Sequence, residues 1–256
     1  MKKIAYLALL LSCCATLVQA VAQAPVKLSS KWQIRKGVDA WPVILNPKND
    51  AERRINGYLT DLNAHLSHSL MDCDATYTQL MGKQHPNEGN EGTKSWTQDI
   101  KVTMLGPTFL SLVATTGFYC GGAHPYGFTG AAVFDLRTGE RADPLSWFLP
   151  SLKASVADED EEGSGLEKSV VVARLLQAYR DATHHECDDT YPDDQPFLIW
   201  PDAVSDKIMI QANRLPGCCA ACGIETSLTL EQARKLGFSE AFLQAISDAH
   251  QQMAHP

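Results

Sequence analysis

Residues 118–127 read FYCGGAHPYG, and residues 128–140 continue as FTGAAVFDLRTGE. Two adjacent glycines, Gly121 and Gly122, permit positive φ angles and a close approach of the backbone. An apolar strand pattern follows them and ends in a glycine-containing turn. The stretch therefore predicts a chain reversal that leads into a strand, with a lone histidine, His124, at the entry of that strand.

Two further strand patterns precede this stretch, at residues 98–103 and 109–116. With the strand at 126–136, and with short glycine-containing links, they predict an antiparallel meander. Ahead of the meander, apolar residues at helical spacing from Ala51 to Leu70 predict a helix that begins with a capping box. Behind it, the pattern predicts helices over 166–182 and 239–253, and paired strands over 197–200 and 207–211. Thr229 with Gln232 predicts a cap for a short helix that runs to Leu236.

The first 22 residues have the three parts of a secretory signal peptide. Lys2 and Lys3 form a basic start, an apolar run follows, and Ala20-Val21-Ala22 supplies the small residues of a cleavage site. We therefore expect a mature protein that is periplasmic or secreted, with no transmembrane anchor after cleavage. An alternative is lipidation at Cys13 in the sequence Leu-Leu-Ser-Cys, which would anchor the protein to a membrane surface.

The mature chain is acidic. Removal of the signal peptide leaves 20 Lys and Arg against 30 Asp and Glu, a net charge of about −10. This balance disfavours nucleic acid, whose binding needs a basic surface, and it disfavours anionic lipid surfaces. It permits a cationic partner.

Six cysteines remain after the signal peptide, and an even number in an exported chain predicts disulfides. We favour a bond between Cys73 and Cys120. Cys187 would then bond to a cysteine of the cluster formed by Cys218, Cys219 and Cys222, and the sequence leaves open which one.

The quoted stretch contains the first cluster that could carry chemistry. The candidate ligand-binding residues are Tyr119, Gly121, Gly122, His124 and Tyr126, because aromatic rings and a histidine surround a tight turn. The alternative interpretation is structural: the glycines form the turn and His124 fixes it through a hydrogen bond to the backbone. A catalytic histidine needs a partner base or nucleophile, and none is visible in the sequence, so we expect no catalytic residue here.

Two other clusters contain metal-ligand or redox residue types. Residues 184–189 read HHECDD and include the common transition-metal ligands, but they lack a standard metal-binding spacing. Cys219-Ala220-Ala221-Cys222 has the spacing of a redox or zinc motif, but a second such pair is absent from the sequence. We therefore expect no metal, no cofactor and no enzymatic activity.

The quoted stretch also resembles a known extracytoplasmic domain. The likeness lies in the motif Tyr-Cys-Gly-Gly-Ala-His-Pro at 119–125, the strand end Asp-Leu-Arg-Thr-Gly-Glu at 135–140, and the anchor Leu-Ser-Trp-Phe at 145–148. These are similar to motifs of the domain shared by the anti-sigma factor RsiV and the peptidoglycan deacetylase PdaC. Weaker likeness in the flanking parts extends the resemblance over most of the mature chain. It implies an α+β fold with a curved antiparallel sheet packed with helices, to which the cysteines would add disulfide staples.

The resemblance implies a binding role at the cell envelope, since this domain binds lysozyme in RsiV-like proteins. We expect residues 23–256 to form a single RsiV-like domain, and leave open a division into two lobes at about 23–105 and 106–256. The expected partner is a cationic protein such as lysozyme, or a peptidoglycan component. The alternative function is an envelope hydrolase or metal-dependent enzyme that uses His124 or the cluster from His184 to Asp189.

Overall fold

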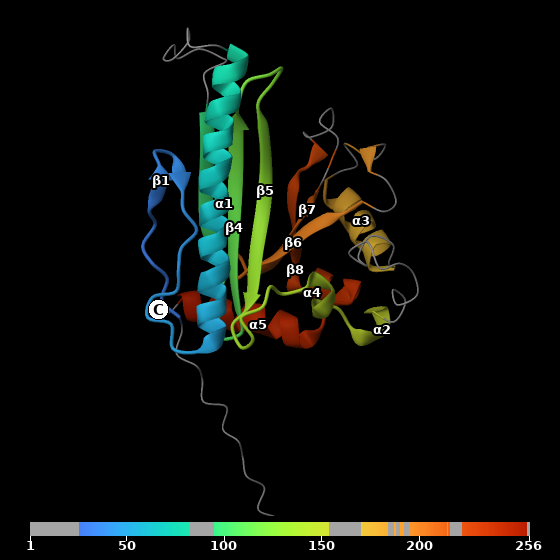
Figure 1. Ribbon diagram of the computed structural model, residues 1–256. Helices are drawn as coiled ribbons and strands as arrows, with labels where there is room; N and C mark the ends of the chain where they lie inside the picture. Colours follow the sequence, from blue (N-terminus) through green and yellow to red (C-terminus); the bar gives the residue numbers. More distant parts are fainter. Residues whose placement is uncertain are drawn as a thin grey trace, which may run out of the picture.

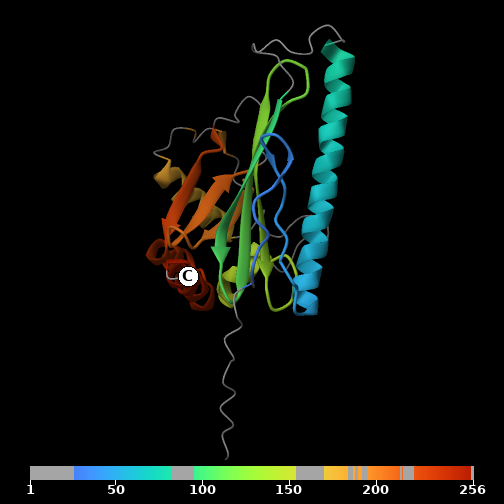
Figure 2. The same ribbon diagram turned by 90° about the vertical axis from the view of Figure 1, so that its left-hand side faces the viewer.

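The protein folds into three layers, seen from two sides in Figures 1 and 2. The computed structural model describes residues 26–81, 95–153, 170–183, 187, 190–191, 195–213, 215 and 222–254. A long helix covers one face of a five-stranded sheet, and a three-stranded sheet packs on the other face (Figure 2). The expected α+β fold class is therefore confirmed. Within the described ranges, no helix is both long enough and apolar enough to cross a membrane.

The five-stranded sheet contains the predicted meander. Its strands follow the order β1-β2-β3-β4-β5, and β3, β4 and β5 pair antiparallel. The sheet is not antiparallel throughout, because β2 pairs with β3 in parallel. The boundary considered near residue 105 falls between β3 and β4, which pair along their whole length. The strands are β1 (Gln33–Arg35), β2 (Val38–Asp39), β3 (Ser95–Leu105), β4 (Phe109–Tyr119) and β5 (Tyr126–Asp135).

The long helix α1 (Asp50–Met81) begins as the sequence predicts and ends later than predicted. The Asn49 side chain accepts a hydrogen bond from the Glu52 amide at 2.8 Å, which satisfies one free N–H of the first turn. We expected the helix to end near Leu70, but it continues for about three more turns. The extension follows the sheet because Cys73 and Tyr77 still bury their side chains at helical spacing.

Helix α1 and the sheet enclose the first hydrophobic core. Ile55 and Leu59 of α1 are fully buried against apolar residues of β4 and β5. Those residues recur at every second position because successive strand side chains point to opposite faces. They are Leu110, Leu112, Ala114, Ala132 and Phe134.

The second sheet consists of β6, β7 and β8, each antiparallel to the next. Thr229 and Gln232 form the predicted capping box at the start of α4. The elements of this half of the protein are η1 (Pro144–Trp147), α2 (Pro150–Lys153), α3 (Val170–Ala182), β6 (Phe197–Asp202), β7 (Lys207–Ala212), β8 (Glu225–Thr229), α4 (Leu230–Leu236) and α5 (Glu240–Ala254).

A second hydrophobic core lies between the two sheets and extends to α3 and α5. Phe109 of β4 contacts Phe242 of α5, with ring centroids 5.7 Å apart. Trp147 stacks on the same phenylalanine at 4.5 Å with nearly parallel rings. The C-terminal helix is therefore part of this core.

Among the described residues, two disulfides link distant parts of the chain. Cys73 bonds to Cys120, the pair that the sequence favoured, and this ties α1 to the end of β4. Cys187 bonds to Cys222, which places its partner within the cysteine cluster as expected. The carbonyl of Cys222 also accepts a hydrogen bond from the Tyr191 hydroxyl at 2.7 Å. Cys218 and Cys219 lie outside the described residues.

Candidate functional site

The five ligand-binding candidates lie together at the tip of the β4–β5 hairpin, near the C-terminal end of α1 (Figure 1). Gly121 and Gly122 both have positive φ, at 89° and 115°, which a residue with a Cβ rarely adopts. A Cβ at Gly121 would also approach Leu80 to 3.2 Å. The Tyr119 hydroxyl donates to the Gly122 carbonyl at 3.0 Å. These residues therefore define the shape of the turn.

The disulfide and a ring contact hold this tip against α1. Cys120 directly follows β4 and bonds to Cys73 in the helix. One turn further along α1, Tyr77 meets Tyr119 edge to face, with ring centroids 6.2 Å apart. The hairpin end is therefore attached to the helix both covalently and by packing.

A row of aromatic rings crosses the strands beside the tip. Trp96 of β3 stacks on Phe118 of β4 at 4.9 Å, and Phe118 stacks on Tyr126 of β5 at 5.8 Å. These residues are direct cross-strand partners, so their rings lie on one face of the sheet. Phe128 joins Phe118 edge to face at 6.3 Å. We call Trp96, Phe118, Tyr126 and Phe128 the aromatic ladder.

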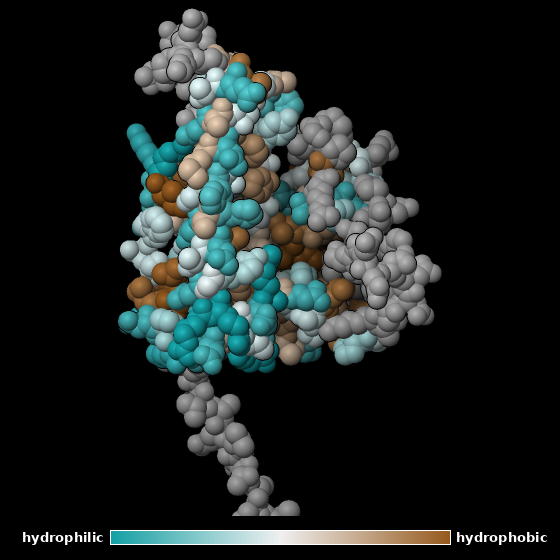
Figure 3. Space-filling view, in the orientation of Figure 1, coloured by the Kyte–Doolittle hydropathy of each residue, from teal (hydrophilic) through white to brown (hydrophobic). Residues whose placement is uncertain are grey.

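The aromatic ladder is open to solvent at the β5 end. Tyr126 and Phe128 are each 54% exposed, although both are large aromatic residues. The space-filling view shows exposed apolar surface beside the upper half of α1 (Figure 3). Clustered exposed apolar side chains on a folded protein mark an interaction site more often than isolated ones do.

His124 extends this surface without an evident catalytic partner. Its ring lies 4.6 Å from the ring of Tyr126, and its Nδ1 lies 3.2 Å from the Pro125 carbonyl. The side chain is exposed, and no acid, base or nucleophile contacts it among the residues that the structure describes. The geometry suits a contact residue at the end of the aromatic ladder.

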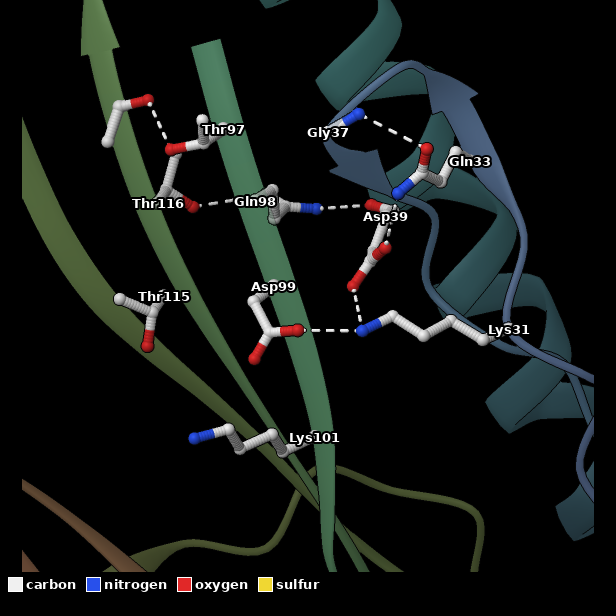
Figure 4. A pocket seen from close by; sticks show the side chains of 11 residues that line it. Lys31, Gln33, Gly37, Asp39, Thr97, Gln98, Asp99, Lys101, Thr115 and Thr116 are labelled. Carbon is white, nitrogen blue, oxygen red and sulfur yellow. Dashed lines mark hydrogen bonds and ion pairs between the residues drawn. The ribbon is translucent and has the colours of Figure 1, made fainter.

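A polar hollow of about 520 Å³ lies between the β1–β2 hairpin and β3 (Figure 4). The Lys31 ammonium bridges two carboxylates, Asp39 at 2.6 Å and Asp99 at 2.7 Å. Asp39 is almost fully buried and also accepts from the Ile100 amide at 3.1 Å. Lys31, Asp39 and Asp99 are thus occupied with one another, and they fasten β2 and the chain just before β1 to β3.

The ionisation of Asp39 follows from these contacts. Burial opposes the charged carboxylate, but hydrogen bonds from Lys31, the Ile100 amide and Gln33 outweigh it and hold the pKa of Asp39 below its ordinary value. Hydrogen bonds to Asp39 and Asp99 raise the pKa of Lys31. Asp39 therefore stays ionised at neutral pH despite its burial.

Most of the candidate metal-binding cluster at residues 184–189 lies outside the part of the chain that the structure describes. His184, His185, Glu186, Asp188 and Asp189 lie outside the described residues. Cys187, the one described member of that cluster, is bound in a disulfide. In the described part of the chain, no group of three His, Cys, Asp or Glu side chains is arranged to hold a metal ion.

The sequence pointed to the tip but missed most of the aromatic ladder. Trp96, Phe118 and Phe128 were not among the candidates. Strand register would have revealed them, because Trp96 and Tyr126 both face Phe118 across the sheet. The register was not available from the strand patterns alone, since a shift by one residue moves a side chain to the other face.

Comparison with known proteins supports the fold. A member of the DUF3298 family from Bacteroides fragilis superposes with a TM-score of 0.55 at 11% identity, over 87% of this chain and 97% of its own. A DUF3298 family protein from Pseudomonas aeruginosa gives a TM-score of 0.35 at 14% identity, over 57% and 66% of the two chains. The latter likeness is too low to carry an argument.

Sequence similarity alone identifies no family for this chain. No family model matches the chain, and no curated protein matches it. At 11% identity the structural likeness establishes a shared fold alone. The chain therefore has the fold of a DUF3298 family protein, while the finer resemblance to RsiV and PdaC stays a prediction.

Proposed function

We propose that this protein is an exported binding module of the cell envelope, and that its aromatic ladder holds a glycan of the envelope. In this proposal residues 1–22 are a signal peptide and residues 23–256 form one binding domain. The two disulfides support an oxidising compartment, where such bonds persist. A lipid anchor at Cys13 remains the alternative way of placing the same domain at the envelope.

The observation that carries the proposal is the row of rings whose β5 end, Tyr126 and Phe128, is exposed. The face of an aromatic ring is electron-rich, and the axial C–H bonds of a pyranose carry partial positive charge. A sugar therefore stacks on Tyr126 and Phe128 through dispersion and a weak electrostatic attraction. Because Phe118 stacks between Trp96 and Tyr126, the rings left for a sugar are those at the β5 end of the aromatic ladder, Tyr126 and Phe128.

The tip also has the stiffness that a binding surface needs. Ordering of side chains and loops opposes association, so a surface that is already ordered binds more tightly. Here the Cys73–Cys120 disulfide and the Tyr119–Gly122 hydrogen bond fix the hairpin before any ligand arrives. Phe118 is held between Trp96 and Tyr126, so its ring loses little freedom on binding.

Binding to insoluble peptidoglycan tests this function. We expect the purified protein to sediment with peptidoglycan, and the Tyr126→Ala, Phe128→Ala double variant to be retained at least about tenfold less well. Trp32→Ala is the matched control, since Trp32 is also an exposed aromatic residue, at 47%, but lies outside the aromatic ladder. No sedimentation of the parent protein, or equal sedimentation of the double variant, would contradict the proposal.

A cationic protein such as lysozyme is the second candidate partner. The net charge of about −10 after signal removal favours it, because opposite charges speed association and strengthen it at low salt. Immobilised lysozyme should then retain the protein at low salt and release it at high salt. Lack of retention at low salt would remove this candidate and leave the glycan proposal standing. The enzymatic alternative stays a prediction, to be checked by release of fragments from the same peptidoglycan.

A further inference from the structure

The outer edge of β5 has two halves that differ in the hydrogen bonds of their backbone. The upper half, toward the hairpin tip, is residues 126–130, and the lower half is residues 131–135. Strand β5 is the last strand of its sheet, so on one side of it no strand lies among the described residues. The Val133 carbonyl accepts from the Ala142 amide at 2.8 Å, and the Asp135 amide donates to the Glu140 carbonyl at 3.0 Å. Both bonds leave the sheet on this outer side. Since backbone groups alternate in direction along a strand, the odd-numbered residues of β5 face outward.

The lower half of this edge is covered by the chain itself. Besides the bonds to residues 140 and 142, the Ala131 carbonyl accepts from Arg141 Nη2 at 3.0 Å. The upper half has no such cover from the part of the chain that the structure describes. Among the described residues, no backbone hydrogen bond reaches the outward N–H and C=O groups of Gly127 and Thr129. These groups remain open at the spacing that an added strand requires.

The open half also lacks the features that normally protect a sheet edge. Natural edge strands carry lysine, proline or a bulge, or they are very short. Residues 126–130 read YGFTG, without charge or proline, and their register with β4 is unbroken. At the opposite edge of the sheet, β1 has only three residues and its register shifts. The contrast singles out the upper half of β5.

A hollow of about 220 Å³ lies alongside the open edge. Gly127, Phe128 and Thr129 line one side of it, and Leu198, Ala212 and Leu215 line the other. The two glycines at 127 and 130 have no side chains, so another backbone can approach closely. Figure 1 shows the upper part of β5 standing clear of β6 and β7, whose sheet lies beside it. The hollow can take an apolar side chain of a segment that pairs with the edge.

We propose that the upper edge of β5 binds an extended peptide segment of a partner as an additional strand. The segment pairs its backbone with Gly127 and Thr129 and inserts one apolar side chain between Thr129 and Leu198. A single strand fits this place better than the flat edge of a second folded copy, because the β6–β8 sheet stands next to β5. Backbone pairing would supply affinity and the hollow would supply side-chain preference. This site binds its ligand through backbone hydrogen bonds, whereas the glycan site proposed above binds through aromatic rings.

The test uses phage-displayed random peptides selected on the full mature protein. We expect selected peptides to share an apolar residue flanked by extended, strand-forming residues. Thr129→Pro should weaken their binding at least about tenfold, because proline removes the outward N–H and its ring blocks the edge. This variant should fold, since that N–H takes no part in the β4–β5 ladder. Thr129→Val keeps the shape and the amide, and it is the matched control.

Hydrogen exchange gives a second measurement on the parent protein. A selected peptide should slow exchange of the Gly127 and Thr129 amides and leave the outward Asp135 amide, already bonded, unchanged. No enriched peptide, or equal binding to Thr129→Pro and Thr129→Val, would overturn the proposal. The protein could instead self-associate in a concentration-dependent way that Thr129→Pro abolishes. That result would make a second copy the occupant of the edge and would overturn the proposal of a peptide ligand. Peptidoglycan sedimentation of Thr129→Pro is expected to be normal, so failure of this inference is distinguishable from failure of the glycan proposal.

Discussion

The two ends of the five-stranded sheet are stabilised in different ways. At its base the sheet lies between α1 and the second sheet, and Leu110 and Phe134 are fully buried there. At its tip the rings of Tyr126 and Phe128 remain half exposed, and the Cys73–Cys120 disulfide holds the hairpin to α1. A polar row of Gln98, Thr116 and Asp39, all buried, crosses the sheet next to the pair of Trp96 and Phe118 and level with Phe128.

This difference shows how a binding surface can be kept open in a stable protein. Burial of apolar area is the main stabilising term at the base. At the tip a covalent link and cross-strand ring pairs replace it, so the fold does not require the aromatic ladder to be covered. The aromatic rings at the tip are then free to contact a ligand without a loss of structure.

The largest expected effect comes from truncating the same residue type at both ends of β5. Phe134→Ala should lower the free energy of unfolding by about 3–5 kcal/mol, because it empties a fully buried site that Tyr58 contacts edge to face. Phe128→Ala should cost less than about 1 kcal/mol, since that ring is half exposed. Urea unfolding of the two variants makes the comparison. Similar losses would mean that base and tip are equally packed.

Removal of the tip disulfide should have the next largest effect. The double variant Cys73→Ser, Cys120→Ser should lose about 2–4 kcal/mol, because the bond closes a long loop with a sequence separation of 47. Denaturant unfolding gives the global loss, and hydrogen exchange should show faster opening at residues 117–126 than at the base of β5. Uniform acceleration along β5 would show that the tip has no separate anchoring.

The polar row should make stability depend on pH. The pKa of Asp39 is lowered by folding, so its contribution is present above the ordinary aspartate pKa of 3.8 and is lost as the pH falls through and below that value. Asp39→Asn should cost about 1–3 kcal/mol at pH 7, since hydrogen bonds to a charged group weaken. The stability difference between parent and variant should shrink in acid. Unfolding measured from pH 7 down to about pH 3 tests the sign, and a constant difference would contradict it.

The smallest expected effect is at His124. His124→Ala should change the free energy of unfolding by less than about 0.5 kcal/mol, because the side chain is exposed and its contacts among the described residues are with Pro125 and Tyr126. Peptidoglycan retention should fall modestly if the imidazole extends the aromatic ladder. A stability loss above 1.5 kcal/mol with unchanged retention would favour the structural interpretation of this histidine.

Sequence patterns predicted the elements whose apolar period is regular. The meander, the capped start of α1 and the capping box at Thr229 follow from local chemistry, and the structure confirms each of them. The predicted end of α1, near Leu70, was wrong because Cys73 and Tyr77 extend the buried face of the helix beyond the leucines that form the visible helical pattern. The parallel pairing of β2 with β3 was not predicted, since two residues carry no periodic signal.

The candidate site could be predicted only in part, and for a physical reason. Turn chemistry at Gly121 and Gly122 is local, so the sequence located the tip. The aromatic ladder and the open edge of β5 depend on which residues face each other across strands, and on which chain segment covers the edge. Those relations are set by tertiary packing, as the covering of Ala131 by Arg141 shows.

The stacking of Phe242 on Trp147 and its contact with Phe109 have a kinetic consequence. Contacts between residues far apart in sequence slow folding, because the intervening chain must be ordered first. The last helix completes the core between the sheets, so a chain synthesised from its N-terminus cannot finish folding until its final residues have emerged. In a stopped-flow refolding experiment, the fluorescence change that reports burial of Trp147 should belong to the slowest major phase.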